Sequence, residues 1–132
     1  MIDTLSQIQF ASQRGQKIVV APLAQALPQL LPEGRVVAIV DAEVDALMAE
    51  YAEKYEIATD NIAAVRYQAK EEIAMKRLLD ENGCKAFSNT FQDLYGMEQL
   101  PGLASQHLMA QGYGYGGEGD WKVAAMTAIM KA

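Results

Sequence analysis

The sequence lacks residues that several classes of protein require. Among its 132 residues there are one cysteine, one histidine, and 11 lysines and arginines against 17 acidic residues. A single cysteine cannot form an internal disulfide bond, so we expect a reducing, cytoplasmic location. A net charge of −6, with the basic residues scattered along the chain, is unfavourable for binding nucleic acid. We therefore expect no nucleic-acid partner.

Long apolar runs are also missing. The run VVAIV at 36–40 is far shorter than the roughly 20 residues that cross a bilayer as a helix. The amino-terminal residues contain no apolar segment flanked by basic residues, as a signal peptide would. We therefore expect no membrane partner.

The composition that remains is typical of a globular domain, with 51% apolar and 21% charged residues. Periodicity, with Asp41, Asp60 and Asp120 as helix caps, predicts alternating helices and strands. The predicted helices cover 3–13, 23–31, 41–55, 60–81, 101–111 and 121–131, and the predicted strands cover 17–21, 35–40 and 84–90. Such alternation indicates a single α/β domain over 1–132, with three α/β/α layers and a mainly parallel sheet.

The most unusual stretch is GYGYGGEGDWK at 112–122. A phosphate-binding loop is a poor interpretation, because Glu118 and Asp120 lie where phosphate would contact the backbone. Glycines allow a tight turn that holds Glu118 outward, near the positive end of the helix that Asp120 caps. A rigid glutamate there could bind a hard divalent cation or transfer protons. Spacing alone does not separate this hypothesis from a tight loop whose acids only cap the helix.

Other candidate residues have simple structural interpretations. A lone histidine cannot build a histidine-based metal site, so His107 is expected to be exposed or packed between helices. Cys84 is expected to be a buried packing residue. Phe91 follows a predicted strand, where it could contact a ligand or belong to the core. The pairs Glu50–Lys54 and Glu72–Lys76 have the spacing of ion pairs on exposed helix faces.

Residues 87–131, FSNTFQDLYGMEQLPGLASQHLMAQGYGYGGEGDWKVAAMTAIMK, resemble the middle segment of bacterial L-arabinose isomerases. The family pattern has a small polar run, F-E/Q-D-L, G-x-x-Q-L-P-G-L-A, then G-Y-G-F/Y-x-x-E-G-D-W-K and an alanine-rich helix. The resemblance continues upstream through VDALMAEYAEKYEI and AKEEIAMKRLLDENG, and it is weak over 1–41. The chain therefore resembles the middle domain of this family, which implies a three-layer α/β fold with a mainly parallel sheet of about four strands.

The resemblance also implies a chemistry. It makes Glu118 a ligand of a catalytic divalent metal, usually Mn²⁺, and a participant in proton transfer, and it makes Phe91 part of the sugar site. The implied reaction interconverts L-arabinose and L-ribulose, an aldose–ketose isomerisation, and D-galactose is not excluded as a second substrate. Because the family forms homohexamers, self-association is also implied.

The family's metal site further requires a second glutamate and two histidines, which lie beyond the match. We therefore expect the isolated 132-residue chain to be an inactive fragment. One alternative is an engineered or recombined α/β scaffold without a catalytic role. Another is a stand-alone sugar-binding or regulatory module that uses Phe91, Tyr113 and Tyr115.

Overall fold

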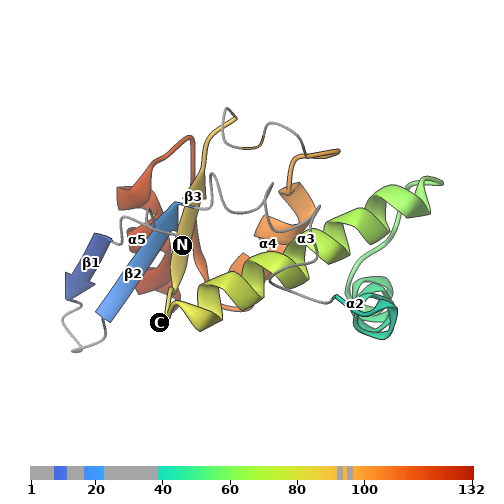
Figure 1. Cartoon of the computed structure of the whole chain (residues 1–132), viewed down its shortest axis with the longest axis horizontal. Helices are drawn as coiled ribbons and strands as arrows, with labels where there is room; N and C mark the ends of the chain where they lie inside the picture. The colour runs from blue at the N-terminus through green and yellow to red at the C-terminus, as the bar shows by residue number, and fades with distance from the viewer. Residues whose placement is uncertain (1–7, 12–16, 23–38, 92–93, 95–96) are drawn as a thin grey trace.

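The computed structural model describes residues 8–11, 17–22, 39–91, 94 and 97–132. It shows an α/β arrangement, as predicted (Figure 1). In chain order the elements are β1 (Ile8–Ala11), β2 (Lys17–Pro22), α2 (Asp41–Lys54), α3 (Ile62–Glu81), β3 (Ala86–Asn89), α4 (Gly102–Ala110), β4 (Gly114–Gly117) and α5 (Trp121–Lys131).

The strands follow one another across the sheet in the order β1-β2-β3-β4. β1 pairs with β2 antiparallel, whereas β2 with β3 and β3 with β4 are parallel, with Asn89 opposite Gly117 at the last position. The predicted helix over 3–13 is wrong at 8–11, because these residues form β1. Pairing with β2 overrides the weak local helix signal there. The two parallel pairings place the carboxyl ends of β3 and β4 side by side.

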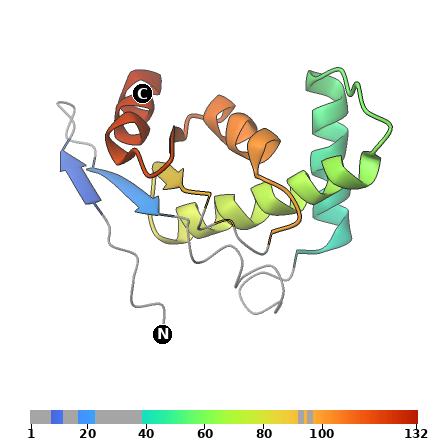
Figure 2. The same cartoon turned by 90° about the horizontal axis from the view of Figure 1, so that it is seen from above.

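Helices contact both faces of β3, and Figure 2 shows α5 and α3 on opposite sides of the sheet. Phe87 belongs to a buried cluster with side chains of α3 and α4, such as Met75, Leu79 and Leu108. Its neighbour Ala86 instead packs with the alanines of α5. This alternation is what a strand buried on both faces requires.

The glycines of β4 allow α5 to lie directly against the strand. A Cβ at Gly114 would meet Ala124 O at 2.1 Å, and a Cβ at Gly116 would meet Asp120 O at 2.2 Å. Both contacts are with helix backbone, which cannot rotate away. The sequence had suggested only a turn here, and that interpretation is wrong for 114–117, which form a strand. The glycines of β4 therefore allow the close packing of α5 on the strand, and this role matters more than forming a turn.

Capping residues start the helices within a residue of the predicted positions. Asp120 caps α5 as predicted, accepting a hydrogen bond from Val123 N at 2.9 Å. The caps predicted at Asp41 and Asp60 are each one residue off. Asn61 caps α3 by accepting from Ala64 N at 3.1 Å, and α2 begins after Val40.

α2 lies away from the sheet, alongside the amino-terminal half of α3 (Figures 1 and 2). Its Val44 and Tyr51 are buried in a cluster with Val65 and Ala69 of α3. Arg66 of α3 also forms ion pairs with Asp41, at 3.1 Å, and Asp45.

The predicted helix at 23–31 and most of the predicted strand at 35–40 fall outside the described residues. Ile39 and Val40, which are described, form no strand. Within the described ranges, no helix combines the length and apolar character needed to cross a bilayer.

Candidate functional site

A cavity of about 250 Å³ lies where the carboxyl ends of β3 and β4 face the start of α4. This is where open α/β sheets usually bind ligands. The cavity brings together Phe91 and Glu118, the two residues singled out in the sequence. Among the described residues, its lining consists of Asn89, Phe91, Leu94, Leu100, Pro101, Gly102, Ser105, Gln106, Tyr115 and Glu118.

Glu118 lies in the tight connection between β4 and α5. Its backbone has a φ of 56°, which is rare for a residue with a side chain. The connection is held to β3 by a hydrogen bond from Gly119 N to Asn89 O at 3.0 Å, and Asp120 N donates to Gly117 O at 3.1 Å. The backbone of this exposed carboxylate is therefore fixed on both sides, and the left-handed conformation marks a candidate functional position.

Tyr115 of β4 lines the cavity together with Glu118. Its hydroxyl donates to Asn89 Oδ1 at 2.9 Å, and its ring packs on Phe87 with 5.0 Å between ring centres. Burial raises the pKa of Tyr115, and the neighbouring Glu118 carboxylate raises it further. Tyr115 therefore stays neutral at physiological pH and orients the Asn89 amide in the cavity.

Phe91 is 63% exposed, so the interpretation of this residue as part of the core is wrong. It follows β3 at the cavity rim, and Leu100, also in the lining, is 55% exposed. An exposed aromatic ring beside polar groups suits the apolar face of a small polar ligand.

The start of α4 supplies lining residues that the sequence interpretation missed. Ser105 is 4% exposed and lines the cavity, yet its Oγ has no hydrogen-bond partner among the described residues. Gln106 lies beside it and is exposed. The sequence does contain one signal that could have identified Ser105 and Gln106, because Pro101 marks the start of the helix on which they lie. In α/β folds such starts gather at the carboxyl ends of parallel strands.

Glu118 is the only carboxylate in the cavity lining described above. Over the described part of the chain, no three His, Cys, Asp or Glu residues converge to hold a metal ion. Hard cations need several oxygen ligands. These residues therefore do not make a complete metal site, and Glu118 could supply one ligand of a site completed by other residues.

His107 is packed between helices, one of its two expected environments. It is fully buried, with Nδ1 2.7 Å from Glu72 Oε1, and Glu72 also accepts hydrogen bonds from Gln111 Nε2, at 2.8 Å, and the Tyr51 hydroxyl. We call Tyr51, Glu72, His107 and Gln111 the polar junction, since they join α2, α3 and α4. Burial, followed by the bond to Glu72, raises the pKa of Tyr51.

The prediction that Glu72 and Lys76 form an ion pair on an exposed helix face is wrong. Glu72 is only 2% exposed and belongs to the polar junction. Lys76 instead pairs with Asp80 at 3.1 Å. The predicted Glu50–Lys54 pair is confirmed at 2.5 Å. Spacing of four residues shows which side chains can meet, but not which helix face is buried.

Cys84 and Tyr113 take structural positions. Cys84 is fully buried, as predicted, and burial raises the pKa of its thiol, so it is a poor nucleophile. Tyr113 is 5% exposed and its hydroxyl contacts Asp80 and Lys76. It does not line the cavity, so its expected part in a sugar-binding module is wrong.

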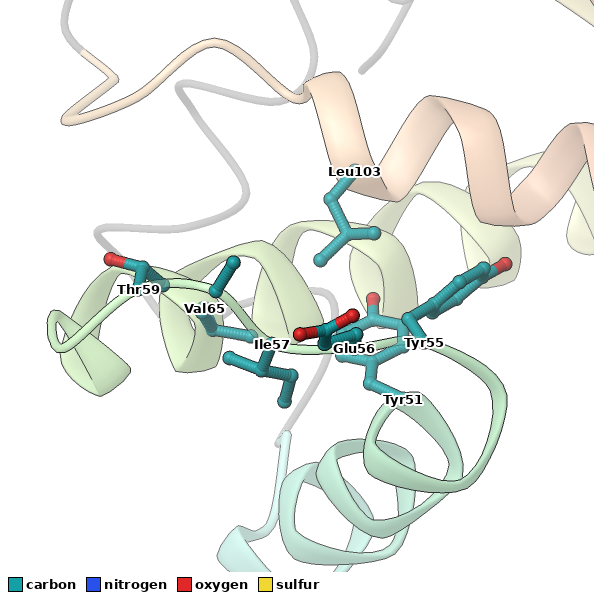
Figure 3. A pocket seen from close by; sticks show the side chains of 8 residues that line it. Tyr51, Tyr55, Glu56, Ile57, Thr59, Val65 and Leu103 are labelled. Carbon is teal, nitrogen blue, oxygen red and sulfur yellow. The ribbon is translucent and has the colours of Figure 1, made fainter.

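A second cavity, of about 200 Å³, lies at the connection between α2 and α3. Figure 3 shows Tyr51, Tyr55, Ile57, Val65 and Leu103 gathered around it. The lining is mainly apolar. Polar groups do not converge there as they do at the ends of β3 and β4, so the first cavity is the better candidate site.

Comparison with known proteins adds independent information. Residues 26–132 match the family model described as the L-arabinose isomerase central domain. The chain is 53% identical over 100 residues to L-arabinose isomerase 2 of Bacillus licheniformis, covering 71% of this chain and 21% of that protein. It is 57% identical over 90 residues to L-arabinose isomerase of Shouchella clausii, covering 67% of this chain and 18% of that protein. The chain thus spans about a fifth of the length of these curated relatives.

Proposed function

Because the chain belongs to the L-arabinose isomerase family, whose central domain it matches over 26–132, we propose that it is part of an enzyme interconverting L-arabinose and L-ribulose. The single observation that carries this proposal is that Phe91 and Glu118 line one cavity at the carboxyl ends of parallel strands. We further propose that residues 1–132 form one three-layer domain, supported by the helices on both faces of β3.

In this proposal Phe91 and Tyr115 bind the apolar face of the sugar, and Asn89 binds its hydroxyls. The Glu118 carboxylate accepts the proton from C2 and returns it to C1, while the proton of the C2 hydroxyl moves to the C1 oxygen, as aldose–ketose isomerisation requires. The strained, fixed backbone of Glu118 supports this role, since proton transfer needs a well-placed group. A divalent metal, Mn²⁺ by family resemblance, would stabilise the charge that develops on the sugar oxygens.

The exposed face of α5 supports a proposal of self-association. It presents Val123, Met126 and Met130, which are 47%, 55% and 80% exposed. Adjacent exposed apolar side chains on one helix are typical of contact surfaces.

The metal role of Glu118 predicts weak, saturable Mn²⁺ binding, with Kd on the order of a millimolar because one carboxylate is a poor site. Glu118→Gln is expected to abolish this binding, measured from the electron paramagnetic resonance signal of free Mn²⁺. Asp120→Asn is the matched control, because it removes a neighbouring charge but keeps a helix-capping side chain. Equal binding by wild type and Glu118→Gln would contradict the metal role and favour the scaffold alternative.

We also propose that the 132-residue chain alone does not turn over L-arabinose. One carboxylate, without a converging set of ligands in the described residues, leaves the charge of the transition state unstabilised. A colorimetric ketose assay with saturating Mn²⁺ is expected to give the rate of the protein-free blank. A rate above that blank that disappears in Glu118→Gln would contradict this proposal.

A further inference from the structure

We propose that Ser105 determines specificity in the candidate site, by hydrogen bonding through Oγ to a hydroxyl group of a neutral sugar or polyol. This inference rests on the proposed sugar site and adds a residue to which no role has been assigned. Ser105 lies in the first turn of α4, lines the cavity with Asn89 and Gln106, and is 4% exposed.

The first argument is the missing partner of Ser105 Oγ. A buried hydroxyl normally makes at least one hydrogen bond, and leaving it unpaired destabilises the protein. Helical Ser and Thr residues usually bond to a backbone carbonyl of the preceding turn. Thr127 on α5 does this, with Oγ1 3.0 Å from Val123 O and 2.9 Å from Ala124 O. Ser105 makes no such bond among the described residues, and its Oγ has almost no accessible surface in this conformation. A rotation about the Cα–Cβ bond, between ordinary serine rotamers, would bring the unpaired hydroxyl to a ligand in the cavity that the residue lines.

The second argument comes from where the unpaired groups lie. Among the described residues, the other buried side chains with unpaired polar atoms are Glu71, Ser88 and His107, and none of them lines this cavity. Ser88 is on β3 beside Asn89, and successive residues of a strand point to opposite faces. Ser88 is therefore a natural comparison, because it is also a buried, unpaired hydroxyl but lies away from the site.

The third argument concerns ligand chemistry. A serine hydroxyl both donates and accepts, so it pairs equally well with another hydroxyl. Among the described residues, the other polar side chains of the lining are the neutral Asn89, Gln106 and Tyr115 and the acidic Glu118. A carboxylate in the cavity disfavours anionic ligands. The exposed ring of Phe91 favours a ligand with an apolar face. A neutral polyhydroxylated ligand meets these conditions, and a sugar acid does not.

The test is a titration of the ¹⁵N-labelled chain with L-arabitol, the open-chain alcohol of L-arabinose, with EDTA present to remove metals. Amide signals of the cavity-lining residues are expected to shift and saturate in wild type. Ser105→Ala is expected to raise Kd about fivefold, as the loss of one neutral hydrogen bond implies. Ser88→Ala is expected to bind as wild type does. L-Arabinonate, the anionic counterpart, is expected to bind more weakly than L-arabitol.

Thermal unfolding separates ligand binding from a structural role. If the Ser105 hydroxyl serves a ligand, its removal relieves an unpaired group, and Ser105→Ala should melt at or above the wild-type temperature. A clear loss of thermal stability would indicate a structural hydroxyl and overturn the inference. The inference would also be overturned if Ser105→Ala bound L-arabitol with the same Kd as wild type. The absence of saturable shifts in the wild-type chain would overturn it as well. The Mn²⁺ titration reports on Glu118 separately, so either proposal can fail alone.

Discussion

Replacing Gly114 by alanine is expected to lower the free energy of unfolding by about 3 kcal/mol or more, because the new methyl group overlaps the backbone of α5. The added Cβ would lie 2.1 Å from Ala124 O and 2.6 Å from Ala128 N. Backbone atoms cannot move aside without shifting the whole helix. Since α5 covers β4, β3 and β2, such a shift disturbs one side of the sheet. Chemical denaturation monitored by circular dichroism measures the effect.

Gly117→Ala is the matched control in the same strand. A Cβ at Gly117 would meet only the Tyr115 side chain, at ordinary contact distances of 3.4 Å to the hydroxyl and 3.9 Å to the ring carbon that bears it. We expect a change of less than about 1 kcal/mol, because alanine also restricts the unfolded chain more than glycine does. Similar losses of stability in both variants would show that backbone flexibility, and not the close approach of α5, is the reason for glycine at these positions. A Gly114→Ala chain that does not fold, beside a folded Gly117→Ala chain, would support the packing argument.

Glu71→Gln is expected to stabilise the protein at neutral and mildly alkaline pH. Glu71 is fully buried, and neither carboxylate oxygen has a hydrogen-bond partner among the described residues. Burial, with repulsion from Glu98, raises the pKa of Glu71 from 4.5 to about 8. At neutral pH the folded protein therefore retains a proton that the unfolded chain has lost.

The pH dependence follows from proton linkage. Between about 4.5 and 8 the folded state binds more protons than the unfolded state, so stability falls as pH rises. The stabilisation that arises from the raised pKa of Glu71 is complete below pH 4.5 and is lost by about pH 8. Over this range the free energy of unfolding falls by up to ~1.4 kcal/mol per pH unit. Chemical denaturation of wild type and Glu71→Gln at several pH values should show that the difference between their free energies of unfolding grows with pH. A pH-independent difference would contradict the raised pKa.

Glu53→Gln provides the control for removing a charge. Glu53 is exposed on α2, so its substitution removes one negative charge without changing a buried group. The free energy of unfolding of Glu53→Gln is expected to stay close to that of wild type across the same pH range. If Glu53→Gln reproduced the effect of Glu71→Gln, relief of general charge repulsion would explain both results.

The sequence predicted helices best, because their start signals are local. Asp120 caps α5 as expected, and α2 begins at the predicted residue 41. Strands were less predictable, since pairing partners lie far away along the chain. The β1 segment was taken for helix, and β4 was taken for a turn because its glycines suggested flexibility. Their actual role depends on α5, which no local pattern reveals.

The candidate site was predicted in part. Family resemblance singled out Phe91 and Glu118, and the structure places them in one cavity. Ser105 and Gln106 were missed because a helix start contains no sign of which strand ends it will face. Glu72 was assigned to an exposed ion pair, although it is buried against His107. Charged residues on a helix are usually exposed, and only tertiary contacts identify the exceptions.

The polar junction has a consequence for how this sequence can change over time. Tyr51, His107 and Gln111 all contact the one buried carboxyl group of Glu72, so removing any of them leaves Glu72 with fewer partners. Substitutions at residues that share a partner are not additive. Viable descendants of this sequence should therefore alter these positions together, whereas a nearby exposed position such as Ala52 can change independently.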